Sequence, residues 1–145
     1  RQTKGAVKLH MLLDHDGYLP DFAMITDGKT ADVTTARHFT LPPGSIVALD
    51  RGYCDFELFS QWNNSGVFFV TRLKGNAVYE VVDNHPVPQH SNVLVDQLIR
   101  FTGPKTSLKY PWLLRRVIVP DASGWESTSH WSTASANRLA DRRLS

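Results

Sequence analysis

The sequence predicts an α/β fold in which a mixed sheet is followed by a β-rich insertion. Three observations lead to this prediction. Residues 4–26 have the pattern of an antiparallel hairpin, residues 45–73 that of a strand–helix–strand unit, and residues 77–121 contain short strand-like segments separated by Pro, His, Asn and Gly. Hairpin strands run antiparallel, whereas the two strands of a strand–helix–strand unit run parallel, so together they form a mixed sheet.

The hairpin is predicted from alternating hydrophobicity. Every second residue from Val7 to Leu13 is apolar, which is typical of a strand with one buried face. Asp16-Gly17 lies in the turn that follows, and residues 21–26 form the returning strand. A short helix is expected over residues 32–39, before Pro42 and Pro43 interrupt the chain.

The strand–helix–strand unit begins with a continuous apolar run, residues 45–49, which indicates a strand buried on both faces. Asp55 can cap a helix that extends to Asn64, and Gly66 can end it. Residues 67–73 form the second strand. The crossover between parallel strands of one sheet is right-handed in nearly all proteins.

The remaining segments complete the predicted organisation. We divide the chain into a partial core at residues 1–76, a β-rich insertion at residues 77–121, and a tail at residues 122–145. The tail is rich in Ser, Thr, Ala and Arg and has neither helical nor strand periodicity, so we expect it to be disordered.

Composition limits the function classes. The chain of 145 residues is 41% hydrophobic and 21% charged, which is typical of a globular domain. A net charge of +2 permits DNA binding without indicating it. The single cysteine excludes an internal disulfide, and no apolar run approaches the ~20 residues of a membrane span, so we expect no membrane partner.

Asp50 is the first candidate for a functional residue. It follows the buried strand of residues 45–49, and ligands of open α/β sheets bind at the carboxyl ends of the strands. A carboxylate there suits Mg²⁺, which takes one or two protein oxygens and keeps several waters. The alternative is that Asp50 flanks a helix and pairs with Arg51, and the pattern alone leaves both open.

Arg72 and Lys74 are candidates for phosphate binding because they follow the next strand. The alternative is a solvated strand end, which the pattern alone favours. A weaker DNA-binding signal lies in residues 105–116, where four basic residues are interleaved with Tyr110 and Trp112, and a solvated sheet face is the alternative there.

The other polar residues are better explained by structure. Asp14, Asp16 and Asp27 lie in predicted turns, where Asp is a common residue. The six histidines lack the spacing of a zinc site. Cys54 has no histidine pattern that would activate a thiol, and we interpret it as a buried structural residue.

Five short blocks, in order and at characteristic spacings, resemble one family. They are Lys4-Gly5-Ala6-Val7-Lys8-Leu9-His10 with Leu13-Asp14, Ile25-Thr26-Asp27-Gly28-Lys29, Asp50-Arg51-Gly52-Tyr53, and Phe69-Val70-Thr71-Arg72-Leu73-Lys74. The chain resembles the DDE transposases of bacterial insertion sequences, in the group with a Tyr-Arg-Glu-Lys signature. The resemblance extends from the amino terminus to about Val119.

The resemblance implies an RNase H-like fold with a β-rich insertion. It implies metal-dependent DNA cleavage and strand transfer, in which three carboxylates hold two Mg²⁺ ions. Asp50 matches the second Asp of the triad, and Arg51, Gly52 and Tyr53 complete its motif. Arg72 would contact DNA phosphates, and the implied DNA-binding residues are Arg51, Tyr53, Arg72 and Lys74. The implied partners are transposon ends and target DNA in the bacterial cytoplasm, and the intact enzyme is a possible homodimer.

The departures from the family lead to a further expectation. The first catalytic Asp should precede the hairpin, and the Tyr-Arg-Glu-Lys signature, which carries the catalytic Glu, is absent after Val119. We therefore expect an internal transposase fragment that is inactive alone, with an aberrant tail after Asp121 that a frameshift would explain. The alternative is a non-catalytic remnant that binds DNA or a partner protein.

Overall fold

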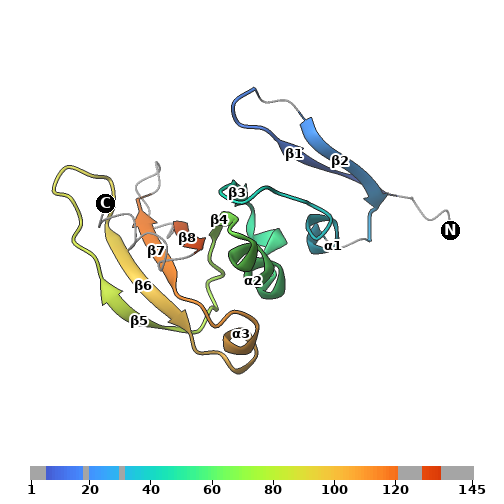
Figure 1. The fold of residues 1–145 in the computed structure, drawn as a ribbon. Coiled ribbons are helices and arrows are strands. Elements are labelled where there is room, and N and C mark those ends of the chain that lie inside the picture. The colour runs from blue at the N-terminus through green and yellow to red at the C-terminus, as the bar shows by residue number, and fades with distance from the viewer. Residues whose placement is uncertain (1–5, 18–19, 30–31, 121–128, 135–145) are drawn as a thin grey trace. The chain divides into compact units, whose positions relative to one another are not determined.

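A computed structural model describes residues 6–17, 20–29, 32–120 and 129–134, with the backbone alone described for Val33 and for residues 129–134. The chain divides into two compact units, residues 1–40 and residues 41–145, which we describe separately. Helices and strands are mixed along the chain, so the predicted α/β class is confirmed (Figure 1).

The first unit contains the predicted hairpin. Strand β1 (Val7–Leu13) pairs antiparallel with strand β2 (Pro20–Asp27), and Leu9 lies opposite Ile25. Helix α1 (Asp32–Ala36) follows and is shorter than predicted. The hairpin and the short helix were therefore both predicted from local pattern.

One buried polar residue lies in this first unit. His10 of β1 is 3% exposed, and its Nε2 lies 2.9 Å from Thr26 Oγ1 on β2. Its Nδ1 lies 3.8 Å from the Asp32 carboxylate at the start of α1. This histidine is a hydrogen-bonded interior residue that joins the hairpin to α1.

The second unit is built on a six-stranded sheet of order β3-β4-β8-β7-β6-β5, in which β3 and β4 are parallel and the other neighbours antiparallel. The strands are β3 (Ile46–Leu49), β4 (Phe68–Arg72), β5 (Tyr79–Asn84), β6 (Val95–Phe101), β7 (Leu114–Val119) and β8 (Ser129–Ala134). Two helices accompany them, α2 (Phe56–Ser65) and α3 (Pro104–Lys109).

The predicted strand–helix–strand unit is confirmed by β3, α2 and β4, but the mixed sheet does not include the hairpin, which forms a two-stranded sheet of its own. Asp55 caps α2 because its carboxylate accepts hydrogen bonds from the backbone N–H groups of Glu57 and Leu58. Gly66 ends the helix with φ of 77°, a left-handed conformation that glycine adopts without strain.

The prediction that the first strand of this unit is buried on both faces is wrong. Val47 is 7% exposed, but Ile46 is 73% exposed. Strand β3 lies at the edge of the six-stranded sheet. Within the described residues, one face of β3 is buried. That face carries Val47, which lies opposite the buried Phe69 of β4. Continuous apolarity therefore does not indicate two buried faces here.

The core of the second unit is aromatic and includes the predicted insertion. Phe59 of α2 stacks on Phe69 of β4 with ring centroids 4.1 Å apart, and Phe56 of α2 meets Phe101 of β6 edge to face at 4.9 Å. Tyr110 is fully buried between Phe69 and Phe101. Residues of the predicted insertion therefore pack in the same core as residues of α2 and β4.

Two elements differ from the sequence-based expectation. The short helix α3 was not predicted; it begins at Pro104, a residue favoured at the first helical position. Strand β8 falls within residues 122–145, for which disorder was predicted, and its backbone pairs with β4 on one side and β7 on the other. The rest of that tail lies outside the described residues.

Candidate functional site

The parallel pairing of β3 and β4 brings the two strongest candidate residues together. Leu49 at the end of β3 lies opposite Thr71 of β4. The next residues of both strands, Asp50 and Arg72, therefore emerge side by side at the carboxyl edge of the pair. A guanidinium nitrogen of Arg72 donates a hydrogen bond to Asp50 Oδ1 at 2.9 Å.

The electrostatics of this pair favour an ionised carboxylate. Asp50 Oδ1 also accepts a hydrogen bond from the backbone N–H of Arg51 at 2.8 Å. The hydrogen bond from Arg72 and the one from the Arg51 backbone lower the pKa of Asp50. The Asp50 side chain is 61% exposed and that of Arg72 is 49% exposed, so both are accessible from solvent.

Arg51 and Tyr53 form the turn that holds Asp50. Residues Arg51–Tyr53 make one turn of 3-10 helix, with Asp50 as its N-cap. The backbone N–H of Tyr53 donates to the Asp50 carbonyl oxygen at 2.9 Å. The Asp-Arg-Gly-Tyr block therefore fixes the backbone around the carboxylate, while roles of the Arg51 and Tyr53 side chains toward DNA stay predictions.

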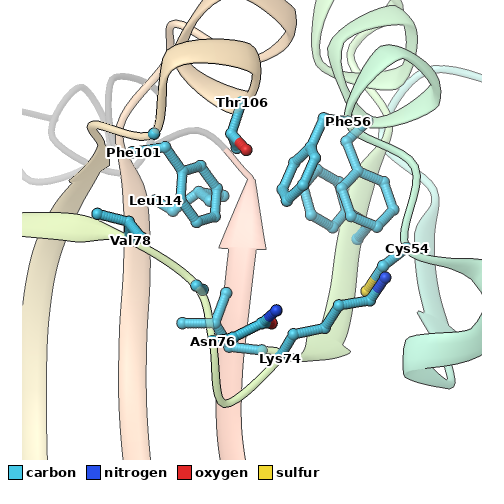
Figure 2. A pocket seen from close by; sticks show the side chains of 13 residues that line it. Cys54, Phe56, Lys74, Asn76, Val78, Phe101, Thr106 and Leu114 are labelled. Carbon is cyan, nitrogen blue, oxygen red and sulfur yellow. The ribbon is translucent and has the colours of Figure 1, made fainter.

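Lys74, two residues after Arg72, lies on the wall of a cavity of about 240 Å³. Figure 2 shows its side chain extending along the rim toward Cys54, with Phe101, Leu114, Val78 and Thr106 across the cavity. The cavity is mostly apolar and aromatic, and sequence reasoning did not find it because its walls come from α2, β4, β6, α3 and β7.

Cys54 is half-buried, whereas the sequence predicted a buried structural residue. Its Sγ lies 3.5 Å from Thr71 Oγ1 and 3.8 Å from the Arg72 carbonyl oxygen. Burial raises the pKa of the Cys54 thiol, with a smaller opposing effect from the Thr71 hydrogen bond. The thiol is therefore protonated at neutral pH and is no activated nucleophile.

Three of the four basic residues of the segment 105–116 form hydrogen bonds or ion pairs within the second unit. Arg115 forms a two-point contact with the carboxylate of Asp96, with N–O distances of 2.9 and 2.6 Å. Arg116 donates to Gln97 Oε1 at 2.6 Å. Lys109 of α3 pairs with Glu57 of α2 at 2.8 Å. These cations hold strands and helices together, which weakens the interpretation of this segment as a DNA surface.

The acidic residues of the predicted turns do not form a metal centre. In the hairpin turn the backbone N–H of Asp16 donates to Asp14 Oδ1 at 3.1 Å, as in an ordinary Asx turn. Throughout the described residues, no group of three or more His, Cys, Asp or Glu side chains is arranged to hold a metal ion.

Asp50 nevertheless has the chemistry of one ligand of a divalent cation. Its carboxylate is ionised, accessible and placed at a strand end, and Mg²⁺ is commonly bound through one or two carboxylates with waters in the other positions. The residue fits a single metal ligand, and further carboxylates are needed to complete a two-metal site.

Within the described part of the chain, no helix has the length and hydrophobicity of a membrane span.

Comparison with known proteins gives the family. The sequence model described as "Transposase DDE domain" matches residues 1–139. A Sinorhizobium fredii (strain NBRC 101917 / NGR234) protein named "Putative transposase y4zB" is 30% identical over 122 residues, which is 81% of this chain and 34% of that protein. The chain thus spans about a third of the length of this relative. No solved structure matches. The chain belongs to the transposase DDE domain family.

Proposed function

We propose that this domain takes part in metal-dependent DNA cleavage and strand transfer during DNA transposition, with Asp50 as a catalytic metal ligand. The observation that carries the proposal is the ionised Asp50 carboxylate beside Arg72 at the carboxyl edge of two parallel strands. Family membership supports the reaction class, and the resemblance of the Asp50-Arg51-Gly52-Tyr53 block supports the role of this carboxylate.

The acidic and basic residues of the site have different roles. A divalent cation supplies activation of the attacking water or 3′-hydroxyl and stabilisation of the leaving oxygen. Asp50 would hold this cation, and the turn formed by Arg51 and Tyr53 would keep its carboxylate in place. Arg72 would bind a DNA phosphate through its planar guanidinium, and Lys74 would add a second positive charge near the same strand end.

We infer an RNase H-like arrangement of the catalytic core, with Mg²⁺ as the cofactor, and transposon ends and target DNA as the substrates. Action in the bacterial cytoplasm and homodimerisation of the intact enzyme follow from the resemblance. Among the described residues, Asp50 is the one carboxylate that we assign to the catalytic triad. We therefore propose that the chain is inactive without the other two carboxylates.

Metal removal tests this proposal. A full-length transposase that carries this domain should convert a supercoiled plasmid bearing transposon ends to cleaved products in Mg²⁺ or Mn²⁺. EDTA should stop the reaction and added Mg²⁺ should restore it, whereas the 145-residue chain alone should give no product. Cleavage in EDTA would refute the metal requirement, and Asp50-dependent cleavage by the chain alone would refute its inactivity.

A further inference from the structure

Asp50 and Arg72 form an ion pair with each other, although the proposed function assigns them different ligands. Asp50 would bind a divalent cation, and Arg72 would bind a DNA phosphate. Asp50 Oδ1 already accepts hydrogen bonds from the Arg51 backbone at 2.8 Å and from Arg72 at 2.9 Å. A cation that coordinates either oxygen of this carboxylate neutralises part of the negative charge that attracts the guanidinium. The cation and the guanidinium also repel each other when both lie against one carboxylate.

Neither partner is held in the pair by burial. The side chains are 61% and 49% exposed, and the contact joins one guanidinium nitrogen to one carboxylate oxygen. Exposed pairs of this kind are weak, so a divalent cation or a phosphate is able to displace either partner. By contrast, Arg115 makes a two-point contact with Asp96, whose side chain is 9% exposed.

We propose that a divalent cation and Arg72 compete for the Asp50 carboxylate, so that cation binding releases the Arg72 guanidinium to bind a DNA phosphate. This inference rests on the proposed function, since it takes Asp50 as the metal ligand. The consequence is ordered assembly: in the absence of metal, Asp50 masks a phosphate-binding arginine, and metal and DNA then promote each other's binding. Such coupling is reciprocal, because each ligand must raise the affinity of the other by the same factor.

Metal affinity gives the first test, on the complete 145-residue chain. Free Mn²⁺ is measured by electron paramagnetic resonance during titration of wild type, Arg72→Gln and Asp50→Asn. We expect Arg72→Gln to bind Mn²⁺ about two- to five-fold more tightly than wild type, the range for loss of an exposed pair, and Asp50→Asn to lose the site. The matched control is Arg100→Gln, which breaks a similar exposed pair with Glu80 (3.2 Å) and should leave Mn²⁺ affinity unchanged.

DNA affinity gives the second test, by fluorescence anisotropy of a labelled duplex at constant ionic strength. Mn²⁺ should tighten wild-type binding about two- to five-fold. Asp50→Asn should lose this response, Arg72→Gln should keep only the smaller part that comes from the charge of the bound ion, and Asp50→Asn should bind DNA more tightly than wild type without metal. A Mn²⁺ response as large in Arg72→Gln as in wild type would overturn the release of Arg72.

The two tests separate failure of this inference from failure of the proposed function. Equal Mn²⁺ affinity of wild type and Arg72→Gln, with loss in Asp50→Asn, would overturn the competition and leave Asp50 as a metal ligand. Unchanged Mn²⁺ affinity in Asp50→Asn would overturn the assignment of Asp50 itself, and with it both proposals.

Discussion

Replacing Asp50 by Asn in a full-length transposase that carries this domain should reduce Mg²⁺-dependent DNA cleavage by at least about 100-fold. Asn keeps the size of the side chain and an oxygen that can accept the hydrogen bond from the Arg51 backbone. It removes the negative charge, which is the property that a metal ligand needs. The measurement is the initial rate of supercoiled plasmid cleavage at saturating DNA.

The chain offers a matched control for this substitution. Asp83 of β5 is exposed and accepts a hydrogen bond from the backbone N–H of Asn84 at 2.9 Å, much as Asp50 does from Arg51. Asp83→Asn should therefore cleave at the wild-type rate. A rate within about three-fold of wild type for Asp50→Asn would show that Asp50 is not a metal ligand in catalysis.

Replacing Phe69 by Ala should lower the free energy of unfolding of the second unit by about 3–5 kcal/mol. Phe69 is fully buried, stacks on Phe59 at 4.1 Å and meets Tyr110 edge to face at 6.1 Å. Its loss opens a cavity where β4, α2 and the residue after α3 converge. Urea unfolding of the 145-residue chain, followed by tryptophan fluorescence, measures the change.

The adjacent residue provides the control for the core. Phe68 points to the other face of β4 and is only partly buried, so Phe68→Ala should cost about 1 kcal/mol. If Phe69→Ala does not fold, the milder Phe69→Leu should still be less stable than wild type by about 1–2 kcal/mol. Equal destabilisation by the two alanine substitutions would contradict a core centred on Phe69.

The strand–helix–strand unit was predictable because its signals are local. Asp55 and Gly66 mark the two ends of α2, and the apolar runs on either side define β3 and β4. From that unit alone it follows that Asp50 and Arg72 emerge at the same edge, since parallel strands end together. Whether the two side chains form a direct ion pair depends on the register of β3 and β4, which the local sequence pattern does not specify.

The domain division was less predictable because it depends on contacts between distant segments. Phe101 and Tyr110 lie in the predicted insertion, yet they pack with Phe56 and Phe69 in one core. Strand β8 pairs with two strands far away in the sequence, and its own residues lack strand periodicity. The basic residues near Arg115 were equally ambiguous, because their partners lie on other elements.

In the function that we propose, Asp50 binds a divalent cation through its carboxylate. The most direct measurement is nuclear magnetic resonance of the ¹⁵N-labelled chain during addition of substoichiometric Mn²⁺, which broadens the amide signals closest to the bound ion. We predict that the signals of Arg51, Thr71 and Arg72 broaden first, and that Asp50→Asn removes this effect. Broadening centred on another carboxylate, such as the turn of Asp14 and Asp16, and unchanged in Asp50→Asn would contradict the claim.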